Sequence, residues 1–414
     1  MKFFNRYLDS KKYVLELLFL ALGFFPLLKT ATLSFSNGLV FHYVFIFSAV
    51  SILAAENLLK KNKVVWLLNL FILFYCVIAY AHQNYQLVSG NLKVFAAAFV
   101  YTNLIYIFYQ LLKSDQRQFY LEKYIKYLFL SSVLFLTLLL ISFIVLFLRF
   151  PIEVSWNEIK NMIMFSRSQD PQLRLDLILR LSVVGLLRNS ITSVSYIGPQ
   201  LLITPFVFIY LYFSKIISFR YFEIKKVWIS LFLVLFTFCV LVTNSRAFAL
   251  AGLFLLIFRF FKFEKNIFLT LSKTAAIIFP FAIYGLPVKV LSNRSCTAQF
   301  VLERISLFGN GISYDVDSLN KSCIFNQSGT SLDMKFLALS FDNVHLELLH
   351  YFGILIYILV IPYILLKLEN RRSSYFFIFF IFIFMSLNFN LFEVVLVPLT
   401  VILSSLAYEK RTAI

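Results

Sequence analysis

The sequence predicts an all-α, polytopic integral membrane protein that crosses the bilayer about twelve times. Hydrophobic residues make up 61% of the 414 residues, and the mean hydropathy is +0.84. Long apolar runs recur along the chain, and Lys and Arg gather in every second gap between them. The runs are continuous, whereas barrel strands would alternate in polarity over about ten residues, so helices are the expected spanning elements.

The expected spans follow one another along the whole sequence. A helix needs about 20 mostly apolar residues to cross the hydrocarbon core, and somewhat fewer when neighbouring helices bury it. The segments that meet this requirement are 13–34, 39–56, 64–81, 94–112, 125–149, 195–214, 227–243, 247–261, 267–286, 347–366, 374–388 and 391–407. No repeat or low-complexity linker divides them, so residues 1–414 are expected to form a single integral membrane domain.

Basic residues indicate which gaps face the cytoplasm. Clusters of Lys and Arg stand at 2–12, 60–63, 113–126, 215–226, 259–265, 367–372 and 410–411. The positive-inside rule places these gaps and both termini in the cytoplasm. The net charge of +18 is therefore attributed mainly to topology and to attraction for anionic lipid, and nucleic acid is not an expected partner.

Two outer loops are too long to be simple connections. The first, 150–194, contains the stretch 171–189, in which an apolar stripe at helical spacing is interrupted by charges. This pattern is typical of an amphipathic helix at the membrane surface. Such a helix either caps the bundle without touching substrate or presents Arg180 and Arg188 at the headgroup level, where guanidinium groups bind phosphate.

The second outer loop, 287–346, is the most polar part of the chain and contains Cys296 and Cys323. A pair of cysteines in one exported loop is compatible with a disulfide in an oxidising compartment and also with two free thiols. The other cysteines, Cys76 and Cys239, lie within expected spans and are interpreted as small apolar core residues.

The end of this loop combines a carboxylate with an imidazole, in the stretch FDNVHLELLHYFG at 341–353. On a helix, Asp342 and His345 share one face, as a general base and its orienting partner require, and Asn343, Glu347 and His350 follow a neighbouring face. Asp342 or Asn343 is also expected to cap the helix. The sequence has neither a phosphate-binding glycine loop nor a zinc-ligand spacing, so it supports neither a nucleotide-driven pump nor a zinc enzyme, and no cofactor is expected.

Two further arginines are candidates for binding an anion. Arg246 lies in a very short outer gap at 243–252, near the hydrocarbon border, where an unpaired cation is costly. It either serves function or extends its side chain to the lipid headgroups. Arg304 precedes Gly309 and Gly311, whose backbone freedom suits a tight loop that approaches a ligand.

The order of these segments resembles that of the O-antigen polymerases and O-antigen ligases of Gram-negative bacteria. This family has an Arg-bearing outer loop and then a Ser-Arg turn between two spans. A large periplasmic loop follows, which begins with Arg and Gly and ends in an (H/D)N…LE…G motif. The matching segments are RLSVVGLLRNS at 180–190, NSRAFALAG at 244–252, ERISLFGNG at 303–311 and DNVHLELLHYFGI at 342–354. The resemblance covers about residues 175–407.

The resemblance implies a metal-independent glycosyltransferase of lipopolysaccharide biosynthesis, at the periplasmic face of the inner membrane. Its donor would be an oligosaccharide on undecaprenyl pyrophosphate, whose pyrophosphate Arg246 and Arg304 would hold through bidentate pairing. Asp342 or His345 would activate the acceptor hydroxyl. Further substrate-binding candidates are Arg180, Arg188, Asn343 and Glu347. The implied partners are the bilayer, the lipid-linked oligosaccharide, a chain-length regulator and a flippase.

One departure from the family pattern favours a polymerase over a ligase. The ligases resemble one another in placing His before the Asn of the last motif, whereas this chain has Asp342 there. A flippase or transporter is a further alternative, but it would carry ionisable residues or broken helices near mid-membrane. The spans here are nearly uncharged, which argues against transport, and a structural subunit of an export complex remains as the non-enzymatic alternative.

Overall fold

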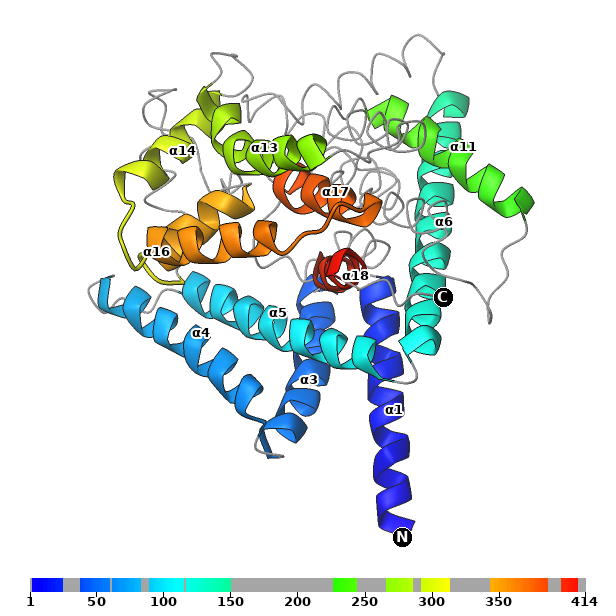
Figure 1. Ribbon diagram of the computed structural model, residues 1–414. Helices are drawn as coiled ribbons and strands as arrows, with labels where there is room; N and C mark the ends of the chain where they lie inside the picture. Colours follow the sequence, from blue (N-terminus) through cyan, green and yellow to red (C-terminus); the bar gives the residue numbers. More distant parts are fainter. Residues whose placement is uncertain are drawn as a thin grey trace. The chain divides into compact units, whose positions relative to one another are not determined.

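The computed structural model describes residues 2–24, 38–59, 62–82, 89–114, 117–149, 226–243, 266–285, 292–312, 343–385 and 396–408. Within these ranges all regular structure is helical, which confirms the predicted all-α class (Figure 1). The helices are α1 (Lys2–Gly23), α3 (Gly38–Leu59), α4 (Lys63–His82), α5 (Ser89–Lys113), α6 (Arg117–Arg149), α11 (Lys226–Thr243), α13 (Asn266–Gly285), α14 (Ser292–Glu303), α16 (Val344–Leu366), α17 (Arg372–Ile378), the π-helix η3 (Phe379–Phe384) and α18 (Leu396–Tyr408).

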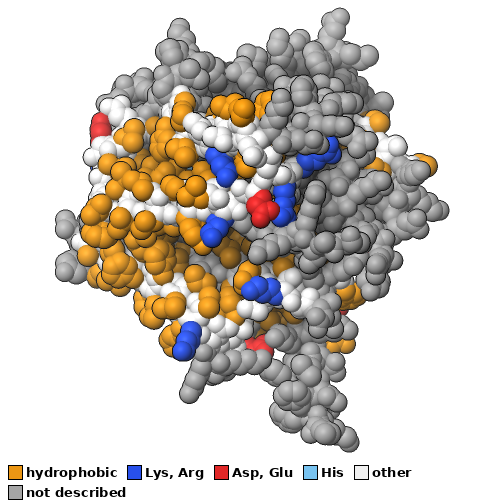
Figure 2. Space-filling model, in the orientation of Figure 1, with side chains coloured by type: hydrophobic (Ala, Val, Ile, Leu, Met, Phe, Trp, Pro, Cys, Tyr) orange, Lys and Arg blue, Asp and Glu red, His pale blue; other side chains and the backbone are white. Residues whose placement is uncertain are grey.

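Among the described residues, three helical segments are long and apolar enough to cross a membrane: Lys63–Ala81, Phe95–Lys113 and Val344–Leu366. In the first of them, only 22% of the apolar window is buried by protein. Hydrophobic side chains accordingly gather over the surface of α4 and α16 (Figure 2). An exposed apolar surface of this kind is typical of helices that face lipid, so the fold indicates membrane association.

Shorter apolar helices coincide with further predicted spans. They lie at Tyr13–Gly23, Val44–Asn57, Val227–Thr237, Asn266–Ala282, Arg372–Ile383 and Val397–Ala407. The predicted spans 195–214 and 247–261 lie outside the described residues, as does the loop 150–194 with its predicted amphipathic helix. The count of twelve spans and the side on which each loop lies therefore stay predictions.

The described residues group into two compact units, of which the first comprises 1–53 and 113–257. In this unit α1 runs alongside α6 (Figure 1). The buried rings of Phe19 and Tyr124 lie 6.3 Å apart between them, and Lys123 of α6 forms an ion pair with Glu16 of α1. The helix α11 also packs on α6.

The second unit comprises residues 54–112 and 258–414 and contains α4, α5 and all helices from α13 onward. Asn69 of α4 and Asn103 of α5 exchange two side-chain hydrogen bonds, at 3.3 and 3.0 Å. A reciprocal amide pair between two apolar helices fixes their register, because sliding either helix would leave polar groups unsatisfied in apolar surroundings. The prediction of a single membrane domain is not tested by this division into units.

The C-terminal helices of the second unit pack around α13, which contacts α14, α16, α17 and η3. Lys273, the basic residue within the predicted span 267–286, donates from Nζ to the Leu368 carbonyl at 3.0 Å, just beyond the C-terminal end of α16. A cation is favourable there because of the helix dipole.

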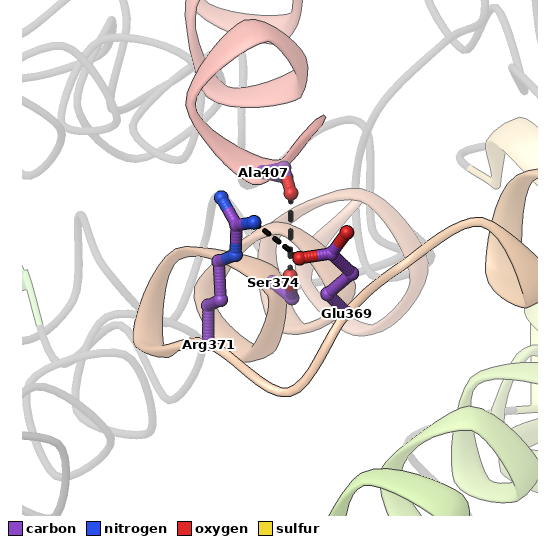
Figure 3. Close-up of polar contacts among 4 residues, drawn as sticks. All are labelled: Glu369, Arg371, Ser374 and Ala407. Carbon is purple, nitrogen blue, oxygen red and sulfur yellow. Dashed lines mark hydrogen bonds and ion pairs between the residues drawn. The ribbon is translucent and has the colours of Figure 1, made fainter. Parts of the chain in front are cut away.

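The short connection from α16 to α17 is fixed by polar contacts. Glu369 forms an ion pair with Arg371, and Ser374 Oγ donates to the Ala407 carbonyl at 3.5 Å (Figure 3). The second of these contacts ties the start of α17 to the C-terminal end of α18.

Candidate functional site

The helix α16 is broken in its middle. Gly353 has φ 80° and ψ 174°, far from helical values, and it separates a first half (344–352) from a second half (354–366). The predicted span 347–366 lies within the apolar segment Val344–Leu366, but the sequence did not lead us to expect the interruption at Gly353. A glycine inside an apolar run was the only local signal of a break.

The break is completed by a segment from the preceding loop, residues 304–312, called here the Arg304 loop. An interrupted helix leaves amide and carbonyl groups without intrahelical partners, which is costly in an apolar setting. Backbone hydrogen bonds from the Arg304 loop satisfy such groups on both halves: Asn310 N to His350 O (2.8 Å), Gly311 N to Tyr351 O (3.1 Å), Ile354 N to Ser306 O (3.1 Å) and Leu355 N to Leu307 O (3.2 Å).

Two glycines of the Arg304 loop are required by this packing. Gly309 and Gly311 have φ of 81° and 83°, in the left-handed region that favours glycine. A Cβ on Gly309 would lie 2.3 Å from the Tyr351 oxygen of α16, and one on Gly311 would lie 2.3 Å from the Ala79 nitrogen of α4. From the sequence alone, this backbone freedom suited a loop that approaches a ligand. The structure shows that it allows close approach to the backbone of two helices.

The first half of α16 begins at a buried cap. Asn343 is fully buried, and its Oδ1 accepts from the backbone N of His345 (2.8 Å) and of Leu346 (3.3 Å). Its Nδ2 donates to the Pro280 carbonyl of α13 at 3.2 Å. The capping role predicted for this position is confirmed. Because both ends of the amide contact protein, Asn343 holds α16 against α13, and its predicted role in substrate binding stays a prediction.

His345 is enclosed on one face of this half-helix. Its ring is 1% exposed and stacks on Phe382 of η3, with centroids 5.3 Å apart. Its Nδ1 lies 3.2 Å from the hydroxyl of Tyr357, in the second half of α16. Its Nε2 is buried beside the main chain of Ile381 and Phe382 but makes no hydrogen bond of normal geometry. His345 therefore faces the interior of the second unit.

The other face of the half-helix carries Glu347 and His350, which are 4% and 2% exposed. Asn310 connects His350 to the Arg304 loop, because its Nδ2 lies 3.3 Å from His350 Nδ1 and donates to the Arg304 carbonyl at 3.0 Å. Tyr101 of α5 lies within electrostatic range of Glu347. The side chain of Asn310 thus connects the motif at 303–311 with the motif at 342–354.

Arg304 itself is exposed and stacks on an aromatic ring. Its guanidinium carbon lies 4.0 Å from the centroid of Phe300, whose ring is 6.2 Å from that of His350. Phe300 comes from α14, a helix within the loop 287–346 that the sequence pattern does not predict. A stacked guanidinium keeps a fixed plane and directs its N–H groups along that plane, an arrangement suited to binding phosphate or carboxylate.

Of the predicted site residues, the structure describes Arg304, on the loop that docks into α16, and Asn343, His345 and Glu347, at the start of α16. His345 lies on the opposite face of this half-helix from His350, which Asn310 connects to the Arg304 loop. Asp342, Arg180, Arg188 and Arg246 lie outside the described residues, as do Cys323 and the side chain of Cys296. His350 was placed on the face of Asn343 and Glu347 from the sequence but was not selected as a site residue, and neither Phe300 nor Asn310 was selected. For His350 the spacing of three residues after Glu347 was the available signal, whereas the contacts of Phe300 and Asn310 depend on tertiary structure.

The described part of the chain holds no group of three or more His, Cys, Asp or Glu side chains that could bind a metal ion. Comparison with protein-family models, with curated proteins and with solved structures finds no match to this chain.

Proposed function

We propose that this protein is an O-antigen polymerase. It joins oligosaccharide repeat units carried on undecaprenyl pyrophosphate at the periplasmic face of the bacterial inner membrane. The proposal rests on the ordered motifs of the sequence. The observation that carries it furthest is the docking of the Arg304 loop into α16, which holds two of those motifs against each other through backbone hydrogen bonds.

In this proposal the protein has about twelve spans, both termini in the cytoplasm and two large periplasmic loops, 150–194 and 287–346. Support comes from the apolar helices and from the Lys and Arg clusters between them. Lys273 agrees with this topology, because its contact with Leu368 directs it toward the proposed cytoplasmic loop 367–372.

The chemistry proposed is transfer of a growing chain to a new repeat unit. The acceptor hydroxyl oxygen attacks the anomeric carbon of the donor sugar, and the bond from that carbon to the pyrophosphate oxygen breaks. The bonding electrons leave with the undecaprenyl pyrophosphate, and a base takes the hydroxyl proton. Arg304 and Arg246 stabilise the leaving pyrophosphate, a contribution that preorganised cations make in many enzymes.

The roles of the remaining residues follow from this scheme. Asp342 and His345 are the candidate bases, and Arg180 and Arg188 bind phosphate at the membrane surface. Glu347 precedes His350, which Asn310 connects to the Arg304 loop, by one helical turn, and its proposed role is to accept a hydrogen bond from a sugar hydroxyl.

A carrier of lipid-linked saccharide is the second candidate function, because α16 is a broken helix. Discontinuous helices near mid-membrane form substrate sites in many secondary transporters. In the sequence, the nearly uncharged spans argue against a transporter, which would carry ionisable residues or broken helices near mid-membrane. The break of α16 at Gly353 supplies one of these two features and so weakens that argument.

A lipopolysaccharide gel of a deletion strain, with and without the wild-type gene, separates these functions. A polymerase is expected to leave a single short band in the deletion strain, corresponding to core plus one repeat unit, and the wild-type gene should restore the ladder. Complete loss of O-antigen from the core would favour a ligase or a flippase. A ladder unchanged by the deletion would contradict all three.

A further inference from the structure

His345 and Tyr357 lie on opposite sides of the break in α16. Their side chains meet through Nδ1 and the hydroxyl, 3.2 Å apart, so one side-chain hydrogen bond joins the two half-helices across the break. The pair is packed from both sides, by Phe382 of η3 on His345 and by Phe281 of α13 at 6.0 Å from the ring of Tyr357. We call this contact the His345–Tyr357 latch.

Docking of the Arg304 loop depends on the angle between the two half-helices. Asn310 and Gly311 donate to carbonyls of the first half, whereas Ser306 and Leu307 accept from amides of the second half. Hydrogen bonds are sensitive to distance and direction. A rotation of one half relative to the other would therefore break one pair of these bonds while the other pair is kept.

The surroundings of His345 do not suit a general base. A base must come within hydrogen-bonding distance of the hydroxyl that it deprotonates, directly or through one water. His345 is 1% exposed, its Nδ1 is engaged by Tyr357, and its ring is covered by Phe382. It also lies on the opposite face of the half-helix from His350, which contacts Asn310 of the Arg304 loop.

We propose that His345 is a positioning residue. Through the latch it sets the angle of the break in α16 and thereby docks the Arg304 loop. A second part of the inference rests on the proposed function: His345 is not the base of the transfer, which leaves Asp342 as the carboxylate candidate for that role.

The latch is tested first by a measurement that needs no activity. In purified full-length protein, Ser306→Cys places a thiol where a buried hydroxyl makes no hydrogen bond, and mass spectrometry follows its labelling by a maleimide. Tyr357→Phe or His345→Ala should raise the labelling rate at position 306 about three- to tenfold, the change that corresponds to loss of one hydrogen bond. Tyr363→Phe, at an exposed site on the same helix, is the matched control and should leave the rate unchanged.

The role in transfer is tested by repeat-unit polymerisation in membranes of the complemented deletion strain. His345→Asn keeps an amide near the position of Nδ1 but removes any basic nitrogen. A positioning role predicts that His345→Asn and Tyr357→Phe each lower the rate by less than about tenfold, and that combining them adds little. A base role predicts a loss of about 10²- to 10⁴-fold in His345→Asn and little effect of Tyr357→Phe, which would overturn the second part.

The two tests fail in distinguishable ways. Equal labelling rates at position 306 in Tyr357→Phe, His345→Ala and Tyr363→Phe would overturn the latch whatever the protein does. If deletion of the gene leaves the lipopolysaccharide ladder intact, the proposed function and the second part of the inference fail together. In that case the labelling rates at position 306 still test whether the His345–Tyr357 latch keeps the Arg304 loop docked.

Discussion

The backbones of Gly309 and Gly353 lie against each other so closely that neither residue has room for a side chain. A Cβ on Gly353 would lie 2.2 Å from the Gly309 nitrogen, and one on Gly309 would lie 2.6 Å from the Gly353 nitrogen. Both residues have positive φ. This contact is the point at which a loop motif and a helix motif, widely separated in the sequence, become one structural element.

Gly353→Ala is expected to undock the Arg304 loop and destabilise the protein. The added methyl group meets backbone atoms rather than a flexible side chain, and the positive φ is unfavourable for alanine. We expect a loss of about 2–4 kcal/mol in the free energy of unfolding, measured by thermal or chemical denaturation in detergent. Leu359→Ala, at an exposed site on the same helix, is the control, and an equal loss in both variants would contradict this account.

Asn343→Ala should also destabilise the protein, because it removes a buried cap. The backbone N of His345 and of Leu346 would lose the acceptor that Oδ1 supplies, and the Pro280 carbonyl would lose a donor. Loss of a cap costs about 0.5–2 kcal/mol, and burial places this case toward the upper end. Asn343→Ser keeps a capping oxygen and should recover part of the loss in the same denaturation measurement. If serine is no better than alanine, the cap is not the cause.

Phe300→Leu is expected to weaken substrate use while leaving the fold intact. The substitution keeps an apolar side chain but removes the ring over which the Arg304 guanidinium lies at 4.0 Å. Loss of a cation–π contact corresponds to about 0.5–2 kcal/mol, or roughly a two- to thirtyfold higher substrate concentration for half-maximal rate. The measurement is polymerisation rate against concentration of lipid-linked oligosaccharide, and an unchanged concentration dependence would show that Phe300 does not orient Arg304.

The proposed topology predicts opposite accessibility for two exposed residues. A cysteine introduced at Leu302 of α14 should react with a membrane-impermeant maleimide in cells whose inner membrane is intact. A cysteine at Arg372, at the start of α17, should react only after that membrane is permeabilised. The wild-type chain, labelled in parallel, corrects for the native cysteines. The reverse pattern would invert the orientation derived from the Lys and Arg clusters.

Local sequence signals predicted part of the site. The pair Asp342–Asn343 before an apolar run predicted a capped helix, and the structure has Asn343 as the cap. The apolar composition likewise predicted the helical class. In both cases the determinant lies within a few residues of the feature, where hydrophobic pattern and capping chemistry act.

The break at Gly353 and the helix α14 could not be predicted in this way. Residues 347–366 are almost uniformly apolar, so a glycine among them is compatible with a straight helix, and the hydrogen bonds that make the break tolerable come from the Arg304 loop. Residues 292–303 are polar, without an apolar stripe, and α14 is held by contacts with α13 and α16. Tertiary contacts decide both features.

The most direct test of the central claim is a lipopolysaccharide gel of the deletion strain complemented with Arg304→Ala, Arg304→Lys or the control Arg372→Ala, with immunoblots to equalise protein level. Arg304 is placed to hold the donor pyrophosphate, and lysine cannot replace its bidentate geometry. The account predicts a single short band with Arg304→Ala, a shortened or weakened ladder with Arg304→Lys, and a full ladder with Arg372→Ala. A full ladder with Arg304→Ala at normal protein level would contradict it.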